Sequence, residues 1–169
     1  MEKPVALFVG RFQPFHNGHV KVVEYMNDEV SKVIIGIGSS QESHSWENPF
    51  TAPERKKMIQ KSLKVFNRYE IIEIPDVNND RIWVAHVKRI APKFTVVYAN
   101  EEHEKNLFSL AGFEVRSTPN FSRDSYSGTL IREKIADDGR WEDLVPRGTI
   151  DVIKEIGGVA RIKELGMMI

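Results

Sequence analysis

Short apolar runs alternate along this chain with segments whose apolar residues recur at helical spacing. The runs cover residues 5–9, 33–37, 71–74, 94–98 and 113–115. Each run is nearly continuous instead of alternating with polar residues, which is typical of strands that are buried on both faces of a parallel sheet. This order of strands and helices predicts an α/β fold.

Helical patterns fill the intervals between the runs. Val20, Val23, Met26 and Val30 recur at helical spacing, Thr51 with Glu54 has the pattern of a capping box, Ile82, Trp83, Val87 and Ile90 precede Pro92, and residues 106–111 precede Gly112. We predict a Rossmann-like, doubly wound, parallel five-stranded sheet over residues 1–126. Residues 127–169 are expected to add one helix and a C-terminal helical tail to the same single domain, 1–169.

Composition narrows the classes of function. The chain has 169 residues, with 24 Lys and Arg against 24 Asp and Glu, so it lacks the basic excess of a general nucleic-acid binder. It has no cysteine, which excludes disulfides and thiolate chemistry. No apolar run approaches the roughly 20 residues that a membrane helix needs, and the N-terminus does not have a signal-peptide pattern. We expect a soluble cytoplasmic protein without nucleic-acid or membrane partners.

Polar segments follow every predicted strand. They read "GRFQPFH", "GSSQESH", "PDVNND", "ANEE" and "STPNFSR" in chain order. Ligands of such sheets bind outside the carboxyl ends of the strands, so these segments are expected to surround the binding site.

The segment "GRFQPFHNGH" places two histidines at the start of the first helix. Free N–H groups at a helix N-terminus attract anions, and the imidazoles of His16 and His19 can donate to phosphate oxygens. Arg11 adds a guanidinium suited to phosphate. In the structural alternative, one histidine caps the helix and the other is a surface residue. A metal site is less well supported, because the pair has no clear third ligand.

The segment "YSGTLIR" resembles a second helix start that is suited to anions. Ser127 is an N-cap candidate, Gly128 leaves the backbone accessible, and Thr129 and Arg132 share one face of the first turn. A simple capped helix is the alternative for this segment taken by itself.

Together, the two segments resemble the HxGH and (S/T)xxxR signatures of the nucleotidylyltransferase superfamily. "GIGSSQESHSWENPFTAPER" and "DRIWVAHV" are similar to the archaeal type of nicotinamide mononucleotide adenylyltransferase, over nearly the whole chain. The resemblance implies adenylyl transfer from ATP to nicotinamide mononucleotide (NMN), giving NAD and pyrophosphate. It also implies a homo-oligomer, such as a hexamer, and Mg²⁺ carried mainly by ATP without a metal site of the protein.

The same resemblance implies roles for individual residues. The catalytic group is His16, His19, Arg11 and Arg132. The ATP site is Gly10, Arg11, Phe12, His16, Gly18, His19, Ser127, Gly128, Thr129 and Arg132. The mononucleotide site is Ser39, Ser40, Gln41, Asp80 and Trp83, with the Trp83 indole stacked on the nicotinamide ring.

Two departures from the family pattern concern the second substrate. Asp80 stands where relatives often have Asn, and "ANEE" replaces "SGNP" after the fourth strand. Another acceptor, such as flavin mononucleotide or phosphopantetheine, and a non-catalytic nucleotide-sensing module are therefore the alternative functions. Arg55 is expected to make a structural ion pair, whereas His44 and Arg123 are left between a site role and a structural one.

Overall fold

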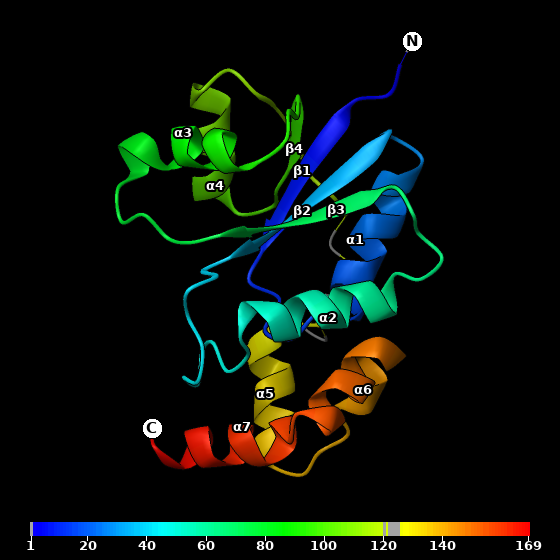
Figure 1. Cartoon of the computed structure of the whole chain (residues 1–169), viewed down its shortest axis with the longest axis vertical. Helices are drawn as coiled ribbons and strands as arrows, with labels where there is room; N and C mark the ends of the chain where they lie inside the picture. The colour runs from blue at the N-terminus through cyan, green and yellow to red at the C-terminus, as the bar shows by residue number, and fades with distance from the viewer. Residues whose placement is uncertain (1, 120, 122–125) are drawn as a thin grey trace.

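The computed structural model describes residues 2–119, 121 and 126–169 (Figure 1). Its strands are β1 (Val5–Gly10), β2 (Lys32–Gly38), β3 (Tyr69–Ile74), β4 (Val96–Tyr98) and β5 (Glu114–Arg116). Its helices are α1 (Asn17–Asn27), α2 (Ala52–Ser62), α3 (Asp80–Ile90), α4 (Glu102–Leu110), α5 (Gly128–Ala136), α6 (Arg147–Glu155) and α7 (Gly158–Met167), with a 3₁₀ turn at Glu142–Leu144. In the part of the chain that the structure describes, no helix is long and apolar enough to cross a membrane.

All pairs of neighbouring strands are parallel, in the order β3-β2-β1-β4-β5, and this confirms the predicted doubly wound sheet. The central strand β1 pairs on both sides, with Phe8 opposite Ile35 of β2 and Tyr98 of β4. The chain reverses its direction of winding between β1 and β4, which is where such sheets open a crevice for ligands.

Alternate residues of the strands supply two separate cores. Ala6 and Ile35 belong to a core that α1, α2 and the C-terminal helices cover, whereas Leu7 and Ile34 belong to a core under α3 and α4. Figure 1 shows α3 and α4 on one side of the sheet and α1 and α2 on the other. This period of two is the expected consequence of a pleated strand that is buried on both faces.

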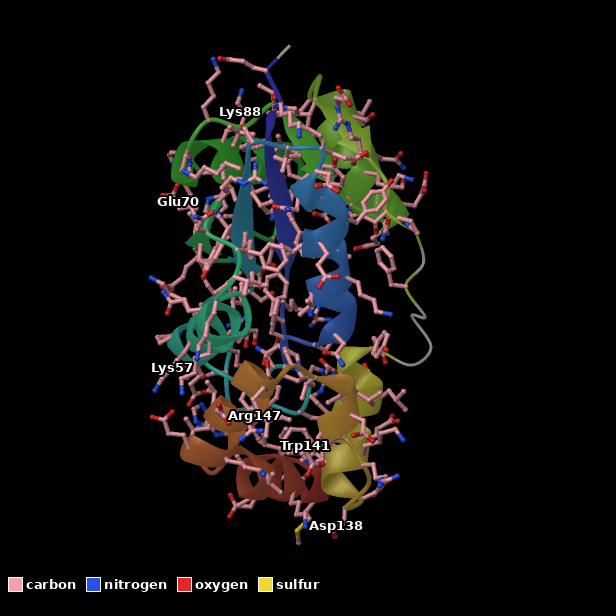
Figure 2. All side chains as sticks on the ribbon, turned by 90° about the vertical axis from the view of Figure 1, so that its right-hand side faces the viewer. Lys57, Glu70, Lys88, Asp138, Trp141 and Arg147 are labelled. Atoms are coloured by element: carbon pink, nitrogen blue, oxygen red, sulfur yellow. The ribbon has the colours of Figure 1, made fainter. Side chains whose placement is uncertain are left out.

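The C-terminal helices extend the core beyond the sheet. α6 packs against α2, and α5 packs against α7. Trp141 is 6% exposed and lies among these helices (Figure 2), whereas the side chains of Lys57 and Arg147 are 45% and 88% exposed. The tail therefore fixes α5, whose N-terminus faces the sheet's carboxyl edge.

α4 begins earlier than expected, at Glu102 instead of Asn106. Its first turn carries acidic residues and no buried apolar side chain, and Phe108 is the one residue of the helix that is buried. Without an apolar period, the first turn gave no helical pattern in the sequence.

Candidate functional site

A cavity of about 850 Å³ opens at the carboxyl edge of the sheet. Residues that follow each of the five strands line it, together with the first turn of α5. Of the predicted site residues, it collects Gly10, Arg11, Phe12, His16, Gly18, His19, Ser39, Asp80, Trp83, Ser127, Gly128, Thr129 and Arg132. Ser40 and Gln41 do not line it.

His16 and His19 form a reciprocal capping box at the start of α1. Nδ1 of His16 accepts hydrogen bonds from the backbone N–H groups of Gly18 at 3.1 Å and His19 at 3.4 Å. Nδ1 of His19 accepts in turn from the backbone N–H of His16 at 3.0 Å. Since both Nδ1 atoms are acceptors, each neutral imidazole carries its proton on Nε2. The capping box thus fixes the tautomer of both rings.

The capping box corrects two expectations for this helix start. The N–H groups of Gly18 and His19 are not free for an anion, because His16 occupies both. Nor is either histidine a mere surface residue, because both cap the helix and both line the cavity. A Cβ on Gly18 would lie 2.9 Å from His16 Cε1, so only glycine leaves room for the capping ring.

Packing keeps the two imidazoles neutral. Their rings stack with centroids 3.5 Å apart, and the Phe12 ring meets that of His19 edge-on at 4.8 Å. Burial lowers the pKa of His16 to about 3, and burial together with the nearby His16 lowers the pKa of His19 well below its ordinary value. The pair therefore offers neutral N–H donors across the physiological pH range.

The second motif forms the start of α5 as predicted. Ser127 is the N-cap residue, and its Oγ accepts from the N–H of Leu130 at 3.1 Å. The Arg132 guanidinium donates to the carbonyl of Gln13 at 2.8 Å and to Thr129 Oγ1 at 3.4 Å. A Cβ on Gly128 would lie 2.9 Å from Arg132 Nη1, so glycine makes the approach of the guanidinium possible.

Arg132 and Arg11 give this end of the cavity its positive charge. Burial lowers the pKa of Arg132 to about 10, and the charge of Arg11 contributes, yet the group stays cationic at neutral pH. Nε of Arg132 is buried and has no hydrogen-bond partner within the described residues. Two cations held together in this way, one with an unused donor, favour a polyanionic ligand.

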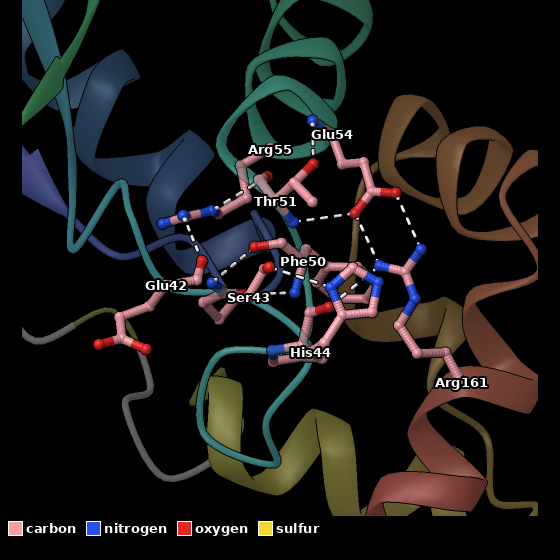
Figure 3. Close-up of polar contacts among 10 residues, drawn as sticks. Glu42, Ser43, His44, Phe50, Thr51, Glu54, Arg55 and Arg161 are labelled. Atoms are coloured by element: carbon pink, nitrogen blue, oxygen red, sulfur yellow. Dashed lines mark hydrogen bonds and ion pairs between the residues drawn. The ribbon is translucent and has the colours of Figure 1, made fainter. Parts of the chain in front are cut away.

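Within the described part of the chain, Arg55 makes no ion pair, contrary to the expectation. It is fully buried, and its guanidinium donates to five backbone carbonyls, those of Thr51, Arg11, Gly38, Ser39 and Glu42, at 2.9–3.3 Å. Figure 3 shows it reaching away from Glu54, which instead pairs with Arg161 at 2.7 Å. Arg55 therefore joins the loops that follow β1 and β2.

The loop after β2 turns two predicted residues away from the cavity. Ser39 has a φ of 46°, and its Oγ donates to Asp76 Oδ1 at 3.1 Å. Gln41 donates to Asp76 Oδ2 at 2.8 Å and accepts from the backbone N–H of Asp76 at 2.9 Å. Ser40 donates its N–H to the carbonyl of Ile74 at 3.2 Å. These contacts hold the loop after β2 to the loop after β3.

His44 and His86 do not line the cavity. His44 contacts Ser43 Oγ at 2.9 Å (Figure 3), and Arg123 is not among the described residues. His86 is buried and bonds to the carbonyl of Pro75 at 2.9 Å.

Trp83 and Asp80 line the cavity from the first turn of α3. The half-buried Trp83 indole meets the Phe108 ring edge-on at 5.3 Å, which leaves it in the cavity lining. Asp80 pairs with His103 Nε2 at 3.1 Å. α3 and α4 thus present an aromatic face flanked by a carboxylate.

Sequence reasoning missed Gln13, although it lies inside the first motif. Its side chain exchanges two hydrogen bonds with the backbone of Phe50, at 3.0 and 2.9 Å, and its carbonyl accepts from Arg132. Gln13 therefore connects the two motifs. Nothing in the local spacing points to Phe50, which is 37 residues away.

In the ranges that the structure describes, no group of three His, Cys, Asp or Glu residues lies close enough to hold an ion.

A parallel doubly wound sheet whose two motif helices begin beside one cavity defines a nucleotidylyltransferase of the cytidylyltransferase-like class. Residues 7–134 match the cytidylyltransferase-like family, and the chain belongs to it. Within that family it belongs with the archaeal nicotinamide-nucleotide adenylyltransferases. It is 48% identical to the protein of that name from Methanococcus aeolicus, over 96% of this chain and 95% of the relative. It is 47% identical to the one from Thermoplasma volcanium, over 95% and 91%.

The fold also has solved counterparts. A bifunctional NMN adenylyltransferase/ADP-ribose pyrophosphatase from Francisella tularensis, complexed with AMP and a manganese ion, superposes with a TM-score of 0.80. The two are 22% identical, and the match covers 98% of this chain but 52% of that one. The present chain thus spans about half the length of that protein.

Proposed function

We propose that the protein transfers the adenylyl group of ATP to NMN, giving NAD and pyrophosphate. The observation that carries the proposal is the pairing of two neutral imidazole donors with the Arg132 guanidinium around one cavity. The relatives named nicotinamide-nucleotide adenylyltransferase support the same reaction over the length of the chain.

The nucleophile of this reaction needs no activation by a side chain. It is an oxygen of the acceptor's 5′-phosphate, which is already an anion. This oxygen forms a bond to the α-phosphorus of ATP while the bond from that phosphorus to the oxygen bridging to the β-phosphate breaks. Pyrophosphate leaves with the electron pair. The protein's task is to align the two phosphates and to stabilise the developing negative charge.

The two motifs divide this task. The Nε2–H groups of His16 and His19 donate to the triphosphate without needing to be protonated first. Arg11 and Arg132 balance the charge of the leaving pyrophosphate, and the N–H groups of Gly128 and Thr129 lie at the α5 N-terminus, where an anion is favoured. The Trp83 indole stacks on the nicotinamide ring. Phe12 and Gly10 complete the ATP side: the Phe12 ring packs edge-on against His19, and Gly10 leaves room for that ring.

The divalent cation enters as part of the nucleotide substrate. A triphosphate supplies the oxygen ligands that Mg²⁺ prefers, and the ion keeps several waters. A homo-oligomer, such as a hexamer, remains a prediction from the family resemblance, and light scattering coupled to size exclusion tests it.

Pyrophosphate release tests the reaction and separates it from the alternatives. The purified protein is given MgATP with NMN, flavin mononucleotide or phosphopantetheine, and pyrophosphate and the dinucleotide are measured. We expect turnover with NMN. Turnover with another acceptor only would reassign the second substrate, and ATP binding without turnover with any acceptor would favour the nucleotide-sensing module.

A further inference from the structure

Cationic and acidic side chains both line the cavity, and Glu47, whose charge acts on Arg132, is among the acidic ones. Arg11 and Arg132 lie at the end formed by the two motifs. Where the first turns of α3 and α4 meet, Trp83 lines the cavity together with the carboxylates of Asp80, Glu101 and Glu104. NMN carries an anionic phosphate at one end and a cationic pyridinium ring at the other, and the proposed stacking puts this ring on Trp83. The carboxylates therefore face the part of the acceptor that carries its ring.

Glu104 is the least expected of these carboxylates. It lies one turn before Phe108, whose ring contacts the Trp83 indole, so Glu104 and Phe108 share one face of α4. Its Oε1 is buried and has no hydrogen-bond partner within the described residues. Burial, together with the charge of Glu101, raises the pKa of Glu104 to about 7. A buried acceptor atom without a donor is costly unless a ligand supplies the donor.

The starts of α3 and α4 meet at this end of the cavity. The ion pair between Asp80 and His103 joins the two first turns. Helix N-termini favour anions, but acidic side chains occupy both first turns here. Consequently, this wall attracts a cation or an N–H donor and disfavours a carboxylate.

We infer that Glu104, with Glu101 and Asp80, determines the choice of acceptor by accepting from the carboxamide N–H₂ of NMN and repelling the ring carboxylate of its deamidated form. The inference rests on the proposed function and goes further, because it names the feature of the acceptor that this chain selects. Nicotinate mononucleotide differs from NMN by that one group, so the pair of acceptors isolates the effect.

The test compares kcat/KM for NMN and nicotinate mononucleotide at pH 8, where Glu104 is mostly ionised. We expect the wild type to prefer the amide by about tenfold or more, as expected for one nearby carboxylate at the dielectric of a half-buried site. Glu104→Gln should reduce the preference by about tenfold, mainly by improving use of the deamidated acceptor. Glu101→Gln, at an exposed position of the same wall, should reduce it less and keeps the test valid if Glu104→Gln does not fold.

Glu102→Gln is the matched control. Glu102 is in the same turn of α4, pairs with Lys105 at 3.8 Å and does not line the cavity. It should leave the preference unchanged. The inference would be overturned if the wild type, Glu104→Gln and Glu101→Gln all showed the same preference for NMN. It would also be overturned if Glu102→Gln reduced this preference as much as Glu104→Gln does.

Calorimetric binding of the two mononucleotides without ATP separates this inference from the proposed reaction. If no acceptor gives pyrophosphate, the proposed function fails, and the ratio of the two dissociation constants still decides the inference. If both acceptors react and bind equally in every variant, the inference fails and the adenylyl transfer stands.

Discussion

Replacing His16 by Asn separates the two roles that the structure gives this histidine. In Asn, Oδ1 takes the place of imidazole Nδ1, so it can still accept from the N–H groups of Gly18 and His19. In the wild type, these groups lie 3.1 and 3.4 Å from His16 Nδ1. Asn is also among the best N-cap residues. It does not have the Nε2–H donor that faces the cavity. His16→Ala removes both the cap and the donor.

The expected free energies of the two variants therefore differ. His16→Ala should lower the free energy of unfolding by about 1 kcal/mol through loss of the cap, whereas His16→Asn should stay within about 0.5 kcal/mol of the wild type. Both should lower kcat by about 10²-fold or more, because a preorganised donor to the developing charge is gone. Urea unfolding and steady-state pyrophosphate release measure the two effects.

Two results would refute this reasoning. Wild-type turnover in His16→Asn would mean that the ring is only a cap. Equal destabilisation by Asn and Ala would mean that Nδ1 does not cap the helix as the geometry indicates.

Further predictions follow from other contacts. Arg132→Lys retains the charge but loses the planar guanidinium, so turnover should fall while the fold survives, and unchanged turnover would leave α5 a simple capped helix. Gly128→Ala should impair turnover similarly, because its Cβ would lie 2.9 Å from Arg132 Nη1, and normal kinetics would contradict this. Trp83→Ala should weaken NMN binding roughly tenfold, with ATP binding nearly unchanged. The wild type should bind the oxidised mononucleotide better than the reduced one, and this preference should be smaller in Asp80→Asn. Titration with both forms checks this, and equal affinities for the two forms would remove the charge argument. The pKa of Glu104 is about 7 in the folded state and 4.5 in the unfolded chain. The free energy of unfolding should therefore fall as the pH rises from 4.5 to 7, with a contribution from this group of at most roughly 3 kcal/mol. Glu104→Gln should be more stable than wild type at pH 8 but not at pH 4.5 by urea unfolding, and parallel pH profiles would refute the buried carboxyl.

The sequence predicted the architecture well because the relevant signals are local. Continuous apolar runs identify buried parallel strands, and the capping box at Thr51 and Glu54 marks the start of α2 within a few residues. Parallel neighbours and right-handed crossovers then follow from the general rules for βαβ units. These features do not depend on contacts between distant segments.

The details of the site depend on such distant contacts and could not be predicted. The carbonyl of Gln13 accepts from Arg132, 119 residues later, and Arg55 bonds to the carbonyl of Arg11, 44 residues earlier. Backbone acceptors of this kind leave no residue type to recognise in the sequence. Ser40 and Gln41 followed the right strand, but after the turn at Ser39 the N–H of Ser40 bonds to the carbonyl of Ile74 and the side chain of Gln41 bonds to Asp76.

Arg55 has a consequence for how the acceptor preference of such a protein can change. One buried guanidinium holds the backbone of the β1 and β2 loops together from beneath the cavity, and it contacts these loops through carbonyls that every residue type provides. Side chains on those loops can therefore be exchanged without altering the spacing of the loops. No comparable anchor joins the starts of α3 and α4 within the described residues; an exposed pair, Asp80 with His103, spans them. New acceptor preferences are thus expected to arise by substitution at α3 and α4, while the part of the cavity beside the β1 and β2 loops keeps its shape.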